Sequence, residues 1–247
     1  IVHKIILCYI QIKVCSLKEN KREFKMGITK NKAFTLAEIL ITLGVIGIVA
    51  AITIPSLSHT LYEKRTVALL KETQSIMAQA VRAAEEEEGE VSGWGLDNNS
   101  SENDAKIIAE KLLKHIKVAQ DCGTYDPQGI CMPNMTYKYL NGGPNWGSYA
   151  TSRSYYKIKL NNGVGILWRS GNSSEAQNKG LYIDFIMDVN GKTPPNVIGQ
   201  DIFELFYEKS SVRAAGAPGY AASSDCRKNG TGWGCAYRVL TTGKIIK

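Results

Sequence analysis

The sequence predicts an α+β fold in which one long helix precedes a small antiparallel sheet. Residues 34–88 repeat apolar side chains at helical spacing. Residues 155–208 contain short runs rich in β-branched and aromatic residues, separated by residues that favour turns. Helical patterns followed by strand patterns are the order typical of an α+β domain, with the helix packed on one face of the sheet.

The first part of the long helix is apolar enough to cross a membrane. From Phe34 to Leu57, Glu38 is the only ionisable side chain in 24 residues, which form about 36 Å of helix at about 1.5 Å per residue. An unpaired carboxylate in such a segment costs on the order of a few kcal/mol, so by default it marks a functional contact. Because no other side chain of the segment can neutralise Glu38, its partner must come from outside the segment.

Beyond Pro55 the helical pattern becomes amphipathic. We expect this half to end near residues 85–88, before Gly89. Four consecutive glutamates at that end are interpreted as a solvated face. The residues that define the apolar face are Leu57, Leu61, Val67, Leu70, Ile76, Met77, Ala80 and Val81.

The remaining chain predicts one more helix and then strands. A Gly-, Asn- and Ser-rich loop at 92–101 precedes a second amphipathic helix, Asn103–Gln120. Two strands, Tyr155–Leu160 and Val164–Arg169, flank an Asn-Asn-Gly turn and form a hairpin, since Asn-Gly tolerates positive φ angles. Further strands are predicted at Leu181–Val189, Ile202–Glu208 and Tyr237–Thr241.

The segment Lys-Ala-Phe-Thr-Leu-Ala-Glu at 32–38 resembles the type IV prepilin signature: a basic leader, a small residue before a cut, then Phe-Thr-Leu-x-Glu opening an apolar helix. The cut is placed between Ala33 and Phe34. The residue usually found before it is Gly, for which Ala is the commonest substitute. The resemblance covers roughly residues 26–65, because small residues and a helix-interrupting proline also match at Gly44, Gly47 and Pro55.

The resemblance implies how such a chain is processed and assembled. A prepilin peptidase removes the leader and methylates the new amine of Phe34. The carboxylate of Glu38 then pairs with the Phe34 amine of a neighbouring subunit. Implied partners are copies of the chain, other pilin-like subunits, an inner-membrane platform protein and its ATPase. An ordinary secretory signal is the rival interpretation, since Val49-Ala50-Ala51 fits a small-x-small cleavage site and would release a soluble domain.

The resemblance divides the chain into four parts. These are a removed cytoplasmic leader (1–33), a transmembrane helix (34–57), its amphipathic continuation (58–88) and a periplasmic globular domain (89–247). Within the first part, residues 1–25 are interpreted as an over-extended reading frame, because the first methionine is Met26; the alternative is a longer leader that is removed with the rest. The expected location is the bacterial inner membrane, with the amino end in the cytoplasm and the globular domain outside it, and afterwards a fibre.

The net charge of +7 does not indicate a nucleic-acid binder. Residues 1–33 contain eight Lys or Arg and two Glu, which leaves 22 basic and 21 acidic residues after the cut. A basic leader holds the amino end of the chain in the cytoplasm by the positive-inside rule. The mature chain is therefore nearly neutral, and no nucleic-acid partner is expected.

Four cysteines follow the cut. In an oxidising envelope, pairs nine residues apart favour two local disulfides, each closing a small loop and contributing about 2–3 kcal/mol. The two pairs are Cys122 with Cys131 and Cys226 with Cys235. Four cysteines still allow three connectivities. Zinc is the rival interpretation, although the chain has no Cys-x-x-Cys pair, and His59 and His115 lie far from the cysteines in sequence.

A polar segment at 188–203 resembles the Asp-x-Asn-Gly, Pro-Asn, Gly-x-Asp-x-Phe pattern of many pilin-like secretion proteins. We interpret it as a strand, a tight Asn-Gly turn and a Pro-rich loop whose Asp caps backbone amides. Calcium is the alternative, with Asp188, Asn190 and Asp201 as its candidate ligands, because Ca²⁺ takes six to eight oxygen ligands. The segment lacks the full EF-hand pattern.

No enzyme signature is present: the Gly-x-Ser-x-Gly, Walker and Rossmann patterns are absent. We expect a structural subunit without a cofactor, either of a type IV pilus-like fibre or of a type II secretion pseudopilus. The alternative from another class is a membrane-anchored or secreted ligand-binding module that uses aromatic loops. Its candidate contact residues are Trp94, Trp146, Trp168 and Trp233.

Overall fold

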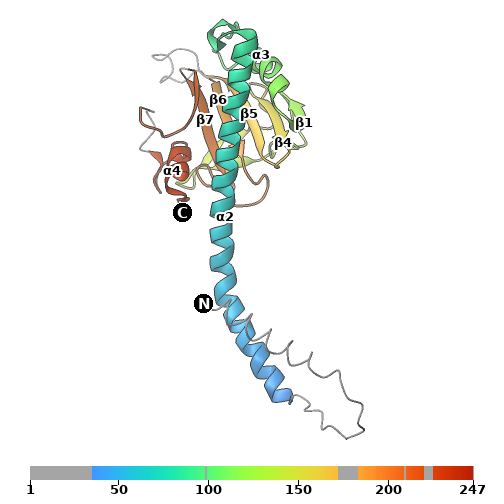
Figure 1. The fold of residues 1–247 in the computed structure, drawn as a ribbon, viewed down its shortest axis with the longest axis vertical. Coiled ribbons are helices and arrows are strands. Elements are labelled where there is room, and N and C mark those ends of the chain that lie inside the picture. Colours follow the sequence, from blue (N-terminus) through green and yellow to red (C-terminus); the bar gives the residue numbers. More distant parts are fainter. Residues whose placement is uncertain (1–34, 98, 172–182, 209, 220–224, 247) are drawn as a thin grey trace, which may run out of the picture. The chain divides into compact units, whose positions relative to one another are not determined.

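The computed structural model describes residues 35–97, 99–171, 183–208, 210–219 and 225–246. The chain divides into two units, residues 1–52 and residues 53–247. Helix α2 (Leu36–Glu88) begins in the first unit and continues into the second (Figure 1). Among the described helices, α2 is the one that is long and apolar enough to cross a membrane. The predicted long amino-terminal helix is therefore present, although Ala33 and Phe34 lie outside the described residues.

The second half of α2 packs one apolar stripe against the sheet. Leu70, Met77 and Ala84 are fully buried at helical spacing, whereas Lys71, Ser75 and similar residues on the opposite face are exposed. Side-chain hydrogen bonds fix the helix along its length. Those given by the structure run from Tyr62 Oη to Gln200 O (3.2 Å), from Gln74 Nε2 to Val212 O (3.3 Å) and from the Tyr207 hydroxyl to the Glu85 carboxylate.

The globular unit contains a six-stranded antiparallel sheet in the order β1-β4-β5-β6-β7-β8. The strands are β1 (Val118–Gly123), β4 (Tyr156–Leu160), β5 (Gly165–Ser170), β6 (Ile183–Asp188), β7 (Ile202–Glu208) and β8 (Ser211–Ala214). A separate pair joins β2 (Thr136–Lys138) to β3 (Pro144–Ser148). The predicted β4–β5 hairpin is confirmed, and Gly163 at its turn has φ +89°.

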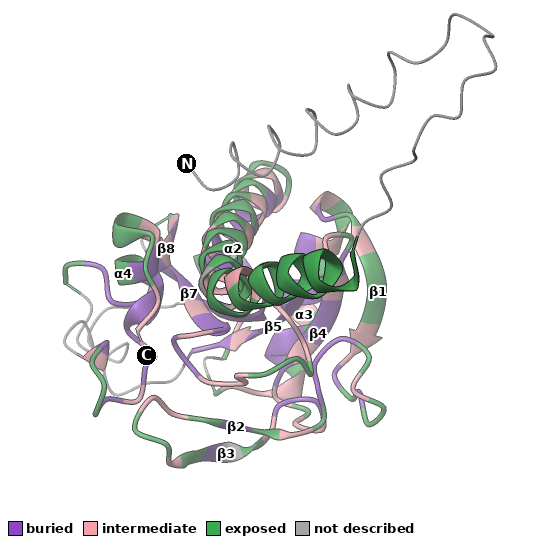
Figure 2. Ribbon diagram, turned by 90° about the horizontal axis from the view of Figure 1, so that it is seen from below, coloured by how far each residue is buried: buried purple, intermediate pink, exposed green. Residues whose placement is uncertain are grey.

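Each face of the six-stranded sheet carries a core. Helices α2 and α3 (Glu102–Leu112) cover one face, on which Ile158, Trp168 and Phe203 are buried. The other face is covered by the β2–β3 pair and its loops, which enclose Tyr137, Leu167 and other apolar residues. Figure 2 shows α2 on one side of the sheet and the β2–β3 pair on the other. The predicted α+β class is confirmed.

The second helix is shorter than the predicted Asn103–Gln120 segment. It ends at Leu112, a 3₁₀ turn η2 (Leu113–His115) follows, and β1 begins at Val118. Ile116 continues the apolar pattern of the helix and is also buried. Its backbone is nevertheless extended (φ −118°, ψ 128°). Pairing of β1 with β4 thus overrides the local helical pattern.

The strand predicted at Tyr237–Thr241 is wrong. Those residues belong to helix α4 (Cys235–Thr242), which ends at Gly243 in the left-handed conformation. Ala236 and Val239 face the core while Tyr237 and Arg238 are exposed, a helical spacing of buried positions rather than strict alternation. Four further short elements were not predicted. These are η1 (Val91–Gly93), β2, β3 and β8.

Gly165 marks a point where the sheet touches a loop with no space for a side chain. A Cβ atom there would lie 2.2 Å from the Cys131 carbonyl oxygen and 2.8 Å from the Met132 sulfur. Real Cβ atoms do not approach backbone oxygens this closely, so the loop carrying Cys131 would have to shift. The close approach fixes the position of that loop on β5.

We therefore expect Gly165→Ala to lower the free energy of unfolding by about 1–3 kcal/mol through overpacking. The urea midpoint of tryptophan fluorescence, measured on the full chain in detergent, reports the change. Gly93→Ala is the matched control, because nothing lies within 4 Å of its Cβ position. Equal midpoints for the two variants would contradict the close packing at Gly165.

Candidate functional site

The Glu38 carboxylate lies in the first turn of α2 and forms a reciprocal cap with Thr35. The Thr35 amide donates to Glu38 Oε2 (3.4 Å), and the Glu38 amide donates to Thr35 Oγ1 (3.2 Å). This is the capping-box arrangement, which satisfies amides at a helix start that lack partners within the helix. Thr35 was not predicted to matter, although Thr followed three residues later by Glu is a sequence signal for this cap.

The cap gives Glu38 a hydrogen bond but no counter-charge. Within the part of the chain that the structure describes, no basic group forms an ion pair with Glu38. The positive end of the helix dipole stabilises a carboxylate at this position by about 0.3–1 kcal/mol at exposed sites. This is a fraction of what a full opposite charge supplies. The predicted partner, the Phe34 amine, and the cleavage residue Ala33 both lie outside the described residues.

The surface around Glu38 is apolar on every side of the helix. Large apolar side chains such as Leu40, Ile46 and Ile52 are more than half exposed in the isolated chain. At Gly44 and Gly47 nothing lies within 4 Å of the Cβ position, so a second helix can approach the backbone closely there. Pro55 lies within α2, and its side chain is outside the description. A helix that is apolar all round is stable only when a membrane or other helices cover it.

Comparison with known proteins identifies this region. A family model described as the prokaryotic N-terminal methylation motif matches residues 28–54. No curated protein and no solved structure matches the chain. The chain thus carries the signature of type IV pilins and pseudopilins, followed by a long helix and an antiparallel sheet. The resemblance drawn from the prepilin-like residues is confirmed.

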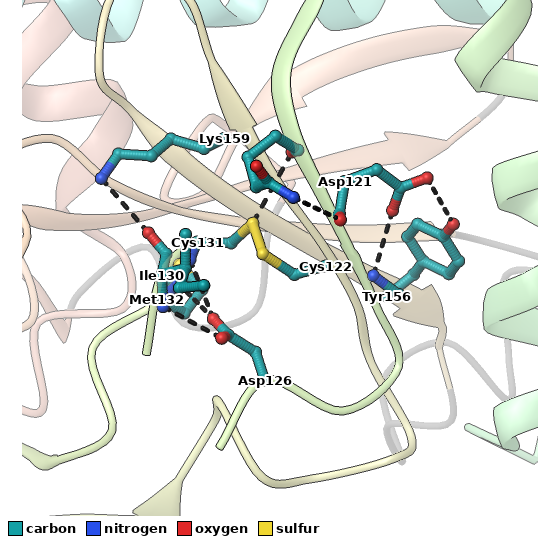
Figure 3. Close-up of a disulfide and its surroundings, with 10 residues drawn as sticks. Asp121, Cys122, Asp126, Ile130, Cys131, Met132, Tyr156 and Lys159 are labelled. Carbon is teal, nitrogen blue, oxygen red and sulfur yellow. Dashed lines mark hydrogen bonds between the residues drawn. A yellow bond between two sulfur atoms is a disulfide. The ribbon is translucent and has the colours of Figure 1, made fainter. Parts of the chain in front are cut away.

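The four cysteines described form two disulfides with the spacing-favoured connectivity. Cys122 bonds to Cys131 and Cys226 bonds to Cys235, with Cα–Cα distances of 6.2 and 4.7 Å. The first disulfide closes a loop that contains Asp126, and the Asp126 carboxylate is hydrogen-bonded to the backbone of the same loop (Figure 3). The carboxylate accepts three backbone N–H bonds, from Ile130 (2.9 Å), Cys131 (2.8 Å) and Met132 (3.2 Å).

This loop also contains the one group of metal-ligating atoms found in the described residues. The ligand atoms of Cys122, Asp126 and Cys131 lie within 4.8 Å of one another. Zinc binds cysteine as the thiolate, whereas both sulfurs are bonded to each other. The Asp126 oxygens are occupied by backbone amides. In the disulfide state this group supports the loop structure, and His59 and His115 are not part of it.

A buried lysine, which the sequence did not single out, supports the same loop from β4. Lys157 Nζ donates to the carbonyl oxygens of Thr124 (2.6 Å), Tyr155 (2.9 Å) and Ser152. Burial lowers its pKa to about 8, although the nearby Asp126 carboxylate favours the charged form. The ammonium is thus satisfied by three carbonyl groups from two segments, the one at Thr124 and the one just before β4, which ties the two together.

The polar segment at 188–203 forms the predicted turn, and its two aspartates are buried. Asp188 Oδ1 accepts the amides of Asn190 (3.0 Å) and Gly191 (2.7 Å), while Oδ2 accepts the Tyr137 hydroxyl (2.7 Å). Asp201 accepts the amides of Asn196 (2.6 Å) and Val197 (2.8 Å). These are the amide-capping contacts expected of a structural turn. Calcium binding by Asp188, Asn190 and Asp201 stays a prediction.

The two carboxylates are electrostatically unfavourable to each other. Burial raises the pKa of Asp201 to about 7, reinforced by Asp188 and opposed by the amides of Asn196 and Val197. Burial likewise raises the pKa of Asp188, against the hydrogen bonds from Tyr137 and two backbone amides. A buried pair of like charges favours the protonated forms.

Because the folded pKa of Asp201 exceeds the unfolded value of about 3.9, protonated Asp201 stabilises the fold below pH 4 and this contribution is lost as pH rises to about 7. We expect Asp201→Asn to flatten the pH dependence of the urea midpoint between pH 4 and 7. Asp225→Asn serves as a control, since its carboxylate caps Thr231 in a different loop. If the urea midpoints of the wild type and Asp201→Asn depended on pH in the same way, the raised pKa of Asp201 would be refuted.

Proposed function

We propose that the chain is a structural subunit of a type IV pilus-like fibre or of a type II secretion pseudopilus. The observation that carries the proposal is the lone Glu38 carboxylate at the start of an exposed apolar helix, inside a match to the N-terminal methylation motif. Such a subunit acts by assembling, and we propose no enzymatic activity and no cofactor for it.

The proposed mechanism begins with processing in the bacterial inner membrane. A prepilin peptidase cuts between Ala33 and Phe34 and methylates the new amine, while the globular domain lies on the far side of the membrane from the leader. A platform protein and its ATPase then move the subunit into a fibre with copies of itself and other pilin-like subunits. These partners are inferred from the motif at residues 28–54.

The Glu38 charge gives assembly its direction and register. In the part of the free subunit that the structure describes, the carboxylate accepts from the Thr35 amide and has no ion-pair partner, which is unfavourable in an apolar surrounding. A neighbour's Phe34 amine supplies the counter-charge only in the assembled state. Apolar contacts along α2 supply cohesion and tolerate sliding, whereas a single polar pair penalises misaligned packing.

The alternative of a ligand-binding module that uses aromatic loops has less support. Trp168 is buried and donates Nε1–H to the Ala105 carbonyl (3.1 Å). Trp94 is buried and donates to the Gly89 carbonyl (2.9 Å). Trp233 packs against the second core, and the Trp146 side chain is outside the description. The described rings therefore support the fold.

Processing has a direct chemical readout. We expect the intact mass of the protein isolated from its native host to match a chain beginning at Phe34 and carrying one methyl group, since that cut places an amine next to Glu38. A chain beginning at Ile52 would instead establish the ordinary signal-peptide interpretation.

Assembly is tested by Glu38→Ala in cells without a wild-type copy. Cleavage and membrane insertion should persist, while incorporation into sheared fibres falls at least about tenfold, because the variant lacks the charge pair that favours the assembled state. Glu38→Gln, which keeps a side chain able to accept from Thr35, separates loss of charge from loss of the helix cap and should also fail to assemble. Wild-type incorporation of both variants would exclude the charge-pair mechanism.

A further inference from the structure

Acidic and basic residues are unevenly distributed over the globular unit, although their numbers nearly balance in the unit as a whole. Residues 82–118, which contain the end of α2 and all of α3, carry nine acidic and five basic residues. Residues 226–246 carry four basic residues and no acidic one. Opposite charge excess at two separate parts of one folded unit creates complementary surfaces.

The basic residues belong to the carboxyl-terminal segment, whose end contacts α2 and whose Cys226–Cys235 loop contacts the β2–β3 connection. We call Arg227, Lys228, Arg238 and Lys244 the basal patch; all four are exposed. The Ile245 amide donates to Glu63 Oε1 (3.4 Å), which places the end of the described chain beside the first turns of this part of α2. The Cys226–Cys235 loop packs on Gly199, next to the Gln200 carbonyl that Tyr62 contacts.

The acidic residues lie at the other end of the same helix. We call Glu86, Glu87 and Glu90 the apical patch; all three are exposed. Their neighbour Glu88 is neutralised by Lys111 (2.7 Å) and Lys114 (2.5 Å), which lowers its pKa to about 2. Among the residues described, Glu86 and Glu90 form no ion pair, and Glu87 approaches only His115 (3.6 Å).

Glu63, which the end of the described chain contacts, and Glu87 of the apical patch are about 36 Å apart along α2, since they are separated by 24 positions at about 1.5 Å each. Figure 1 places α4 toward one end of the sheet and α3 at the other. Within the described chain, Arg227, Lys228 and Lys244 also form no ion pair. Both patches therefore keep charge available for another molecule.

We propose that the apical patch of one copy docks on the basal patch of the next copy, in a head-to-tail contact that repeats along the fibre. Two different patches on one subunit make a heterologous contact, and such contacts propagate into open filaments when the rotation between copies does not close a ring. Charge complementarity at the contact fixes polarity and suppresses tip-to-tip pairing. The inference rests on the proposed fibre-forming function and names the surface by which globular units meet.

The test uses two charge-reversed full-length variants in cells without a wild-type copy. In Glu86→Lys/Glu90→Lys both patches are basic, and in Arg227→Glu/Lys228→Glu/Lys244→Glu both are acidic. Each variant alone should lose at least about tenfold of its fibre incorporation, because like charges then face each other. Produced together, the two can alternate along the fibre, and incorporation should recover at least about fivefold from the level of either alone.

Rescue in trans is a readout that a folding defect cannot produce. Membrane levels and both disulfides, followed on non-reducing gels, identify any variant that fails to accumulate; Glu86→Gln/Glu90→Gln and Arg227→Gln/Lys228→Gln then replace the reversals, each with a smaller expected loss. Glu72→Lys is the matched control, because Glu72 is exposed on α2 between the patches, and it should assemble at the wild-type level.

The outcomes separate this inference from the proposed function. If the wild type forms fibres and each reversed variant assembles equally well, the head-to-tail contact is wrong while the fibre function stands. If each variant fails alone and the mixture also fails, the patches do not pair with each other and the contact is again wrong. If the wild type itself forms no fibre, it is the proposed function that fails.

Discussion

A single carboxylate in an otherwise apolar helix is the constraint on which the account of this protein depends. Glu38 begins a segment whose other side chains have no charge. Within the described residues it accepts a hydrogen bond from the Thr35 amide and forms no ion pair. An apolar environment raises the free energy of such a charge until an opposite charge arrives. We propose that another molecule contributes that charge, which makes the assembled state the favourable one.

The rest of the structure is arranged around the helix that carries this carboxylate. In its first half α2 is exposed and apolar on all sides, and in its second half only one stripe is buried, against the sheet. The change follows from the sequence, because apart from Glu38 the charged residues of α2, such as Lys64 and Lys71, appear only after Leu57. The first half of α2 is thus suited to an apolar environment and the second half to packing on the sheet. Hydrogen bonds of Tyr62, Gln74 and Glu85 hold the second half on the globular unit.

Local signals in the sequence predicted the elements whose structure is decided locally. The β4–β5 hairpin follows from an Asn-Gly turn between two strand-forming segments, and the polar turn at 188–191 follows from the Asp-x-Asn-Gly pattern. The sequence failed where distant contacts decide. Val118 to Gln120 continues a helical pattern yet pairs with β4, and the segment from Tyr237 to Thr241 has strand-forming composition yet packs as a helix beside the Cys226–Cys235 bridge.

Part of the candidate site could also be predicted from the sequence, because its signals are local. Glu38 stands out because its neighbours are apolar, and the cysteine spacing favoured the connectivity found in the structure. Buried Lys157 and the mutual proximity of Asp188 and Asp201 depend on segments brought together only by folding. The separation of the basal and apical patches likewise requires the folded position of α4, because residues 86–90 and 227–244 are far apart in sequence.

Zero-length carbodiimide cross-linking of isolated fibres tests the central claim most directly, because it joins a carboxylate to an amine only when the two are in contact. Fibres assembled from a mixture of ¹⁴N- and ¹⁵N-labelled subunits distinguish links between chains from links within one chain. The account predicts a cross-linked peptide in which Glu38 of one isotope is joined to the Phe34 amine of the other. Intact fibres in which Glu38 reacts only within its own chain, or not with Phe34 at all, would contradict it.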